Sequence, residues 1–237
     1  MRILVINPVT TREWLEKDQE YLRGIADYGT SVEVVRIERG PKSIETFYDA
    51  TYAGPEILRL VKQEGKEADA IVINCFADPA VDAAREVVEK VVVGPAETSM
   101  SVALHLGSKF SVISTFANSA PWVRLQVAKF GVESRLASAI GVEIPVLELE
   151  KDSTKAVDEI VRAAQEAIDR DGAEVIVLGC TGMACLAQKI RQRLTVPVIE
   201  PAATALKMAE LLVKLGLCHT RGRSYLVPSF DKIEGYE

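Results

Sequence analysis

Two cysteines end two similar apolar segments of the chain. Residues 68–75 read ADAIVINC and residues 173–180 read AEVIVLGC, so Cys75 and Cys180 occupy matching positions. Parallel α/β sheets place their chemistry at the carboxyl ends of their strands. If the two segments are equivalent strands of two related halves, both thiols reach one cleft. Two opposed thiols can take a proton from one face of a carbon and return one to the other face, which inverts a stereocentre.

The residues after each cysteine indicate a turn that leads into a helix. Asp78-Pro79 is a helix-start pattern, with the aspartate as cap and the proline in the first turn. The segment 179–182, Gly-Cys-Thr-Gly, indicates a tight turn in which Thr181 is a candidate cap. Helix N-termini stabilise anions, so we expect the pKa of both thiols to be lowered toward neutrality.

Each cysteine also has a purely structural interpretation, as a small buried residue at a strand end. The occurrence of two, at equivalent positions and before helices, favours a shared function. A disulfide between them is an alternative that a reducing compartment disfavours. Of the remaining candidates, we expect Cys185 to be a core residue, Cys218 to be incidental, His105 to be a capping or surface residue and His219 to have no role.

Strand-like and helix-like segments alternate along the chain, which predicts parallel sheets covered by helices on both faces. In the first half we expect strands at 3–7, 31–37, 70–74 and 91–93, and helices at 13–27, 53–65, 79–90 and 97–106. In the second half we expect strands at 110–115, 141–148 and 175–179, and helices at 121–130, at 154–170 and after Cys180.

The order of these segments repeats. GVEIPVLE (141–148) matches SVEVVRIE (31–38), and VPVIEPAATA (196–205) matches VVVGPAETSM (91–100). Ordered matches with a period this long predict an internal duplication into two related α/β lobes rather than a solenoid. We expect a discontinuous first lobe of residues 1–97 plus about 203–237, because the last helix would pair with the lobe opposite its own repeat, and a second lobe of residues 98–202.

Composition and motifs argue against several classes of partner and cofactor. A net charge of −6 with mixed signs argues against a nucleic-acid surface. No apolar run is long enough for a membrane span, and no leader pattern precedes the first strand, so we expect a cytoplasmic protein. The chain has no C-x-x-C pair, G-x-G-x-x-G or P-loop, so no metal or cofactor is expected. We expect a homo-oligomer that acts on a small molecule.

Loops at the strand ends hold the polar candidates for binding that molecule. Asn7 and Thr115 stand at the ends of the first strand of each lobe, and Asn74 lies next to the first cysteine. The segment 114–118 could add further polar groups. Thr98 and Thr204 follow two other strands, and helix capping accounts for them equally well.

Several of these motifs resemble one family. Asn7-Pro8, the run 75–79 (Cys-Phe-Ala-Asp-Pro), Gly94 with Glu97, and the run 179–183 (Gly-Cys-Thr-Gly-Met) resemble the hydantoin racemase branch of the aspartate/glutamate racemase superfamily. The resemblance extends from residue 1 to about residue 217. It implies a cofactor-independent isomerase with two pseudo-symmetric lobes, in which one thiolate removes the proton and the other thiol replaces it.

The resemblance also implies a substrate and a site. The expected reaction is racemisation of a 5-monosubstituted hydantoin at its 5-position, with backbone amides at 75–76 and 180–182 holding the oxygens. Gly182 stands where aspartate and glutamate racemases usually have His or Glu, which argues against an amino acid. The expected catalytic residues are Cys75 and Cys180, and the expected substrate-binding residues are Asn7, Asn74, Phe76, Thr115, Thr181 and Gly182.

Other functions stay open at this point. Allantoin racemases are close relatives, and an amino-acid racemase is a further alternative. A one-cysteine decarboxylase or isomerase could use the same scaffold, with Cys75 as a nucleophile. A two-lobed ligand-binding module is the non-enzymatic alternative, and it would not need a thiol at both strand ends.

Overall fold

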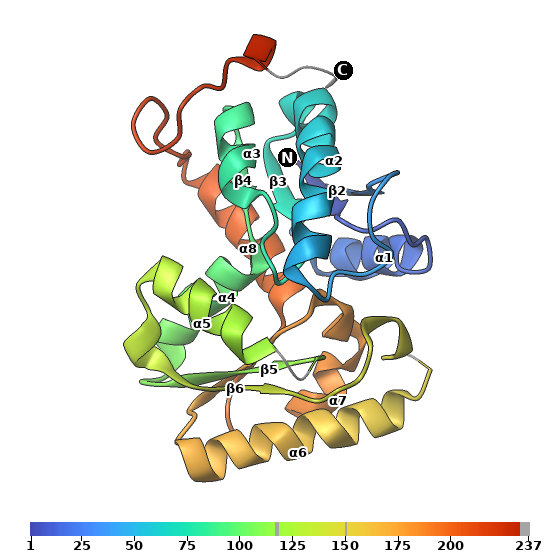
Figure 1. Cartoon of the computed structure of the whole chain (residues 1–237), viewed down its shortest axis with the longest axis vertical. Helices are drawn as coiled ribbons and strands as arrows, with labels where there is room; N and C mark the ends of the chain where they lie inside the picture. The colour runs from blue at the N-terminus through green and yellow to red at the C-terminus, as the bar shows by residue number, and fades with distance from the viewer. Residues whose placement is uncertain (117–118, 150, 233–237) are drawn as a thin grey trace.

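The computed structural model describes residues 1–116, 119–149 and 151–232 as two parallel four-stranded sheets flanked by helices (Figure 1). This architecture confirms the predicted two-lobed α/β fold. The first sheet has the order β2-β1-β3-β4, with β1 (Arg2–Asn7), β2 (Ser31–Arg36), β3 (Ala70–Ile73) and β4 (Val91–Val93). The second has the order β6-β5-β7-β8, with β5 (Phe110–Ser114), β6 (Leu136–Gly141), β7 (Val175–Leu178) and β8 (Val198–Ile199).

Eight α-helices in the described residues connect and cover the strands. They are α1 (Leu15–Ile25), α2 (Phe47–Glu64), α3 (Val81–Val87), α4 (Pro95–Leu106), α5 (Ser119–Phe130), α6 (Ser153–Asp171), α7 (Ala187–Arg191) and α8 (Pro201–Lys214). None of the helices in these ranges combines the length and apolar character needed to span a bilayer.

The strand register explains why the cysteines are equivalent. In the first sheet Ile6 pairs with Ile73, and in the second Ile113 pairs with Leu178. One residue further on, the amide of Asn74 donates to the carbonyl of Ile6 at 2.8 Å, and the amide of Gly179 donates to that of Ile113 at 2.7 Å. Each cysteine is the next residue after this last ladder bond.

The same register corrects one predicted equivalence. Counting from the paired isoleucines, the position of Asn7 in the first lobe corresponds to Ser114 in the second, not to Thr115. The sequence alone aligned the ends of two apolar runs, whereas the hydrogen-bond ladder defines the true correspondence. The polar groups that surround the two cysteines therefore differ in kind.

Helices α4 and α8 lie between the sheets and contact each other. Small residues let α8 approach the first sheet, where Ala202, Ala205 and Ala209 pack with residues of β1 and β3. In the same way α4 packs on the second sheet through Ala96 and Met100. Figure 1 shows the orange C-terminal helix α8 returning toward the blue and cyan part of the molecule. The proposed division at residues 97 and 203 stays a prediction, and residues 233–237 lie outside the described ranges.

Two predicted elements are displaced. Helix α2 begins at Phe47 rather than at residue 53, because Thr46 and Asp49 form a capping box at 3.1 Å and 2.9 Å that the sequence reading overlooked. The strand predicted at 141–148 is wrong: β6 lies at 136–141, and after it the chain turns at Glu143, whose φ is 55°, toward Pro145. The match of GVEIPVLE with SVEVVRIE is therefore not a match of equivalent strands.

The segment after α8 covers the open edge of the first sheet. The amide of Val92 in β4 donates to Nε2 of His219 at 2.7 Å, and Arg85 donates to the hydroxyl of Tyr225 at 3.0 Å. Arg221 pairs with Glu89 at 2.6 Å. His219, for which the sequence suggested no role, thus satisfies an edge strand that would otherwise expose an unpaired donor.

Candidate active site

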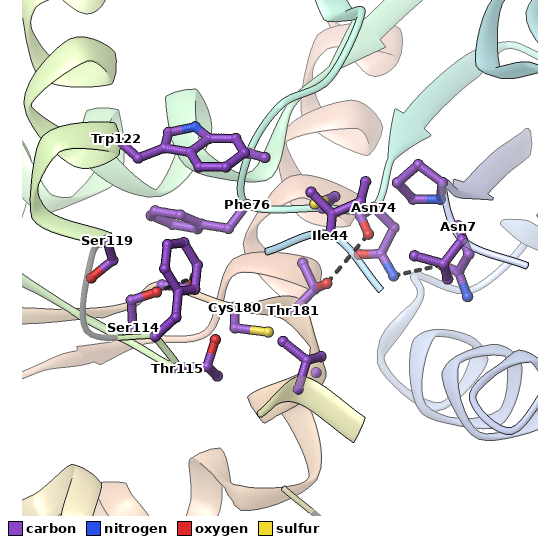
Figure 2. A pocket seen from close by; sticks show the side chains of 18 of the residues that line it. Asn7, Ile44, Asn74, Phe76, Ser114, Thr115, Ser119, Trp122, Cys180 and Thr181 are labelled. Atoms are coloured by element: carbon purple, nitrogen blue, oxygen red, sulfur yellow. Dashed lines mark hydrogen bonds between the residues drawn. The ribbon is translucent and has the colours of Figure 1, made fainter. Parts of the chain in front are cut away.

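Cys75 and Cys180 line one pocket, which lies between the lobes at the carboxyl ends of β3 and β7. The six predicted substrate-binding residues line the same pocket, namely Asn7, Asn74, Phe76, Thr115, Thr181 and Gly182. Figure 2 shows Cys180 and Thr115 on one side and Asn7 on the other, with Phe76 and Trp122 beside each other. The structure therefore brings together all eight predicted positions; their roles remain predictions.

The turn that carries Cys75 is short and tightly bonded. The amide of Asp78 donates to the carbonyl of Cys75 at 3.0 Å, and Asp78 and Ala80 both have positive φ, at 49° and 57°. The prediction that Asp78 caps the following helix is wrong, because α3 begins later and has no side-chain cap. The Asp78 carboxylate instead accepts from the amides of Ala96, at 3.0 Å, and Glu97, at 2.9 Å, at the start of α4.

Gly94 makes this long-range cap possible. A Cβ added to Gly94 would lie 2.5 Å from the Asp78 carboxyl carbon, closer than real Cβ contacts allow. Burial raises the pKa of Asp78 to about 7, while the hydrogen bonds from the Ala96 and Glu97 amides act to lower it. Because α4 packs on the second sheet, Asp78 ties the first-lobe cysteine turn to the second lobe.

Two further side chains from the second lobe hold the same turn. Gln126 of α5 donates through Nε2 to the carbonyl of Phe76 at 2.6 Å. Thr181 donates through Oγ1 to the carbonyl of Asn74 at 3.3 Å. The prediction that Thr181 caps its own helix is therefore wrong. The backbone amide of Cys75 donates to Ile73 at 2.8 Å, so it is not available to hold a substrate oxygen as we expected.

Apart from the bond between Thr181 and Asn74, the turn that carries Cys180 is held by its own lobe. Cys180 precedes a 3₁₀ segment, Thr181–Leu186, and its carbonyl accepts from Met183 at 3.1 Å. Gly179 fits closely against the strand beside it, since an added Cβ would lie 2.9 Å from Cγ1 of Val112. Cys185, predicted to be in the core, is exposed, because the 3₁₀ segment points it away from the face that an α-helix would bury.

Both thiols have a raised pKa, which corrects the expected lowering. Burial raises the pKa of Cys75 to about 12, opposed by a hydrogen bond from the Ala77 amide. Burial also raises the pKa of Cys180 to about 12, opposed by hydrogen bonds from the Gly182 and Met183 amides. Local backbone donors favour the thiolates as predicted from the turns, but the loss of hydration outweighs them.

Each sulfur also responds to neighbouring charges. A negative charge on Cys180 raises the pKa of Cys75, and Asp78 has the same effect. The carboxylates of Glu45 and Asp18 raise the pKa of Cys180. Because the charge of one thiolate disfavours the other, a state with two thiolates is disfavoured, and near neutral pH both sulfurs are mostly protonated.

Polar atoms in the pocket fall into two groups. Asn74 donates to Asn7 at 2.9 Å and Asn7 donates to Asp18 at 2.7 Å, so these amides form a bonded chain (Figure 2 shows the Asn74–Asn7 bond). Four buried atoms of pocket residues have no hydrogen-bond partner within the described part of the chain: Oδ1 of Asn74, Oγ1 of Thr115, Oγ of Ser119 and Oε1 of Gln126. These atoms are available to a ligand.

Apolar side chains form the rest of the wall. Trp122 is stacked on Phe47 with ring centroids 4.5 Å apart, and Phe116 meets it edge-on at 6.1 Å. Ile44 and Val146 also line the pocket. Sequence reasoning missed this wall, and it missed Asp18 and Gln126, because they lie on helices and loops far from either cysteine in the chain. A polar residue on the inner face of a helix was the only signal.

Other predicted candidates lie elsewhere. Thr98 and Thr204 donate to the carbonyls four residues before them, at 2.8 Å and 2.6 Å, so each hydroxyl bonds within its own helix and neither caps it. Ala117 and Asn118, in the segment expected to supply polar groups, lie outside the described residues. No Lys, Arg or His is among the described pocket residues, and residues 1–116, 119–149 and 151–232 contain no cluster of three His, Cys, Asp or Glu able to hold a metal ion.

Comparison with known proteins agrees with this geometry. The family model described as Asp/Glu/Hydantoin racemase matches residues 3–209. A hydantoin racemase from Paenarthrobacter aurescens is 35% identical over 231 residues, which cover 97% of this chain and 98% of the relative. The structure of allantoin racemase from Pseudomonas fluorescens superposes with a TM-score of 0.95 at 35% identity, covering 99% of this chain and 100% of that one.

A second solved structure, allantoin racemase from Klebsiella pneumoniae, has a TM-score of 0.93 at 34% identity and covers 99% of this chain and 96% of that one. The predicted resemblance to the hydantoin racemase branch is thereby confirmed. This chain belongs to the Asp/Glu/Hydantoin racemase family and is a racemase of that superfamily.

Proposed function

We propose that this racemase inverts 5-monosubstituted hydantoins at C5, with Cys75 and Cys180 as its two acid/base groups. The observation that carries the proposal is that two thiols reach one pocket from matching strand ends of two lobes. Inversion without a cofactor needs a base on one side of the carbon and an acid on the other. Relatives of nearly equal length from Paenarthrobacter aurescens and Rhizobium meliloti carry the name hydantoin racemase.

The reaction balances without any other reagent. The thiolate of one cysteine takes the C5 proton, and the electrons of the C–H bond pass into the neighbouring carbonyl as an enolate. The thiol of the other cysteine then gives its proton to the opposite face of C5. The two sulfurs end with exchanged protonation states, ready for the opposite enantiomer or for proton exchange with water.

The raised thiol pKa fits this chemistry. A hydantoin C5–H is a weak acid, so a base of high pKa lies closer to it in proton affinity than an ordinary carboxylate does. Repulsion between two thiolates disfavours the loss of both protons, so when one sulfur becomes a thiolate the other keeps the proton that the mechanism needs. The scarcity of thiolate near neutral pH predicts a rate that rises with pH.

The unpartnered polar atoms match the ring of a hydantoin. Two are amide oxygens, Oδ1 of Asn74 and Oε1 of Gln126, which accept hydrogen bonds as the two ring N–H groups require. Two are hydroxyls, of Thr115 and Ser119, which can donate to the ring carbonyls and to the developing enolate.

The wall favours an apolar substituent. Trp122, Phe116, Phe76 and Ile44 surround the pocket with apolar surface, which suits an aryl or alkyl group at C5. An aspartate or glutamate substrate brings two carboxylates, and cationic side chains that would pair with them are absent from the described lining.

Allantoin is the second candidate substrate. It shares the hydantoin ring, and two solved structures at 34% and 35% identity carry the name allantoin racemase. Its ureido group is polar, however, and would leave hydrogen-bonding atoms against the aromatic wall. We therefore place substrates with apolar substituents first.

A substrate panel tests the proposal. Polarimetry of single enantiomers of 5-benzylhydantoin, 5-methylhydantoin, allantoin and aspartate should show enzyme-dependent racemisation fastest for 5-benzylhydantoin and none for aspartate. Enzyme-free samples correct for spontaneous racemisation, and mass spectrometry should show an unchanged molecular formula. Faster turnover of allantoin would favour the second candidate. Decarboxylation, or no turnover of any hydantoin, would overturn the proposal.

A further inference from the structure

The bonded amide chain in the pocket has a fixed direction. Asp18, as a carboxylate, only accepts hydrogen bonds, so Asn7 turns its NH₂ group toward it at 2.7 Å. The side-chain oxygen of Asn7 then faces Asn74, whose NH₂ group donates a hydrogen bond to it at 2.9 Å. Each amide has one donating and one accepting end, so the charge on Asp18 fixes the orientation of both.

The direction of these hydrogen bonds leaves one side-chain oxygen in the pocket available to a ligand. Oδ1 of Asn74 is the last atom of the bonded series Asp18–Asn7–Asn74. It is buried and has no hydrogen-bond partner within the described residues. Asn74 as a whole is only 6% exposed, so water outside the pocket does not hydrate this oxygen. A buried acceptor without a partner is costly, and a ligand that donates a hydrogen bond there removes that cost.

We infer that Asp18 is a specificity-determining positioning residue, which orients Asn74 to accept the ring N–H bonded to the reacting carbon. The inference rests on the proposed function. Asn74 directly precedes Cys75 in the chain and lines the same pocket, and N1 of a hydantoin is bonded to C5, the carbon that the thiol must reach. The N1–H group is therefore the donor that Asn74 selects.

Within its described residues, the second lobe has no equivalent of this series of bonded amides. Ser114 and Gly179 occupy the positions that Asn7 and Asn74 occupy in the first lobe. The amide chain thus distinguishes the two sides of the pocket, and it orients the N1 side of the ring toward the first lobe.

An isosteric pair of substrates tests the inference. In a 5-benzyloxazolidine-2,4-dione an oxygen replaces the N1–H, so the ring offers a lone pair instead of a donor. For each compound, kcat/KM is divided by the rate of uncatalysed C5 proton exchange. By this measure the parent enzyme should prefer 5-benzylhydantoin by about ten- to one-hundredfold, because the ring oxygen of the dione cannot donate a hydrogen bond to Asn74. Asp18→Asn should reduce this preference by about fivefold or more, since its amide can donate as well as accept.

The ratio of the two substrates isolates the effect. Loss of the Asp18 charge also lowers the pKa of Cys180, but a change in thiolate content alters both rates alike and cancels in the ratio. Glu16→Gln is the matched control, because it removes an exposed charge from the same helix. It should keep the parent ratio. Asn74→Ala, which removes the acceptor itself, should lower the preference even if Asp18→Asn does not fold.

The outcomes separate the two claims. Parent enzyme that racemises the hydantoin, with the same substrate ratio in Asp18→Asn and Asn74→Ala, would overturn the role of the amide chain and leave the proposed function standing. Parent enzyme that turns over neither compound would overturn both. A preference that falls in both variants and persists in Glu16→Gln supports the inference.

Discussion

The two lobes carry a cysteine at the same strand position but hold it in different ways. The Cys75 turn is bonded to the other lobe through Asp78, Gln126 and Thr181. Apart from the shared Thr181–Asn74 bond, the Cys180 turn relies on a close fit at Gly179 and on bonds within its own segment. Duplication therefore accounts for where the thiols stand, whereas later differences between the halves account for what surrounds them.

The caps of α4 and α8 illustrate this divergence. Glu200 caps its own helix, accepting from Ala202 and Ala203 at 2.7 Å each. At the matching position of α4 the chain has Gly94, and the carboxylate comes from Asp78 in the cysteine turn. A cap that is local in one half is a contact between lobes in the other. Asp78 can thereby position the Cys75 turn, whereas the capping bonds of Glu200 stay within its own helix.

The largest predicted effect is the loss of racemisation on removal of either cysteine, and it should be the same for both lobes. Cys75→Ala and Cys180→Ala should each lower racemisation of both enantiomers by about a thousandfold or more, because each direction of inversion needs both thiols. Circular dichroism of the substrate measures the rate, and Cys185→Ala serves as an exposed control with parent activity. A single variant that keeps the parent rate in either direction would break the equivalence of the lobes.

The next prediction separates the two caps. Asp78→Asn should lower kcat by about ten- to one-hundredfold with little change in KM, since the amide cannot accept from both α4 amides and the Cys75 turn shifts. Glu200→Gln should keep kcat within about twofold and lower the free energy of unfolding by about 1–2 kcal/mol.

Steady-state kinetics and urea denaturation measure the two effects. Gly94→Ala should reproduce the kinetic defect of Asp78→Asn, because the added Cβ occupies the space of the carboxylate. Equal kinetic defects in Asp78→Asn and Glu200→Gln would show that both caps act only through stability.

A third prediction concerns pH and both thiols together. The ordinary thiol pKa is 9.0 and burial raises it to about 12 in each case. Between these values the unfolded chain has lost protons that the folded chain retains, so stability falls as pH rises from about 9 toward 12. The melting temperature of the parent should therefore fall more steeply over this range than that of a Cys75→Ala/Cys180→Ala variant. Identical slopes would contradict the raised pKa.

The smallest predicted effect lies at the weakest link between the turns. Thr181→Val removes the 3.3 Å hydrogen bond to the Asn74 carbonyl while keeping the side-chain shape. We expect a loss of about two- to tenfold in kcat/KM, as for one neutral hydrogen bond. Thr98→Val, which removes a helix-internal bond away from the pocket, is the control. An effect at Thr98 as large as that at Thr181 would argue against a link specific to the turns.

The sequence was most informative where the physics is local. The apolar runs before Cys75 and Cys180 specify buried parallel strands, and their ends specify the edge of the sheet where the pocket forms. The partner of Asp78 could not be predicted, because the capped helix is α4 rather than the one that follows directly. The prediction of a lowered thiol pKa was wrong for a related reason. The sequence indicated the turns that follow the cysteines, but the burial of the two thiols depends on how both lobes pack.

The displaced strand teaches the same lesson. GVEIPVLE has a strand-like composition, yet the smaller residues of 136–141 pair with β5, and the chain turns at Glu143 inside GVEIPVLE. The aromatic wall and the amide chain from Asp18 to Asn74 gather residues from distant segments. Only the three-dimensional arrangement identifies them as a site.

Proton exchange in deuterated water tests most directly the claim that the two sulfurs serve opposite faces of one carbon. Cys75→Ser and Cys180→Ser should each exchange the C5 proton of one hydantoin enantiomer without inverting it, and the two variants should act on different enantiomers. Proton NMR of each pure enantiomer, with an enzyme-free reference, follows the exchange. Exchange of the same enantiomer by both variants, or undiminished inversion by either, would contradict the account.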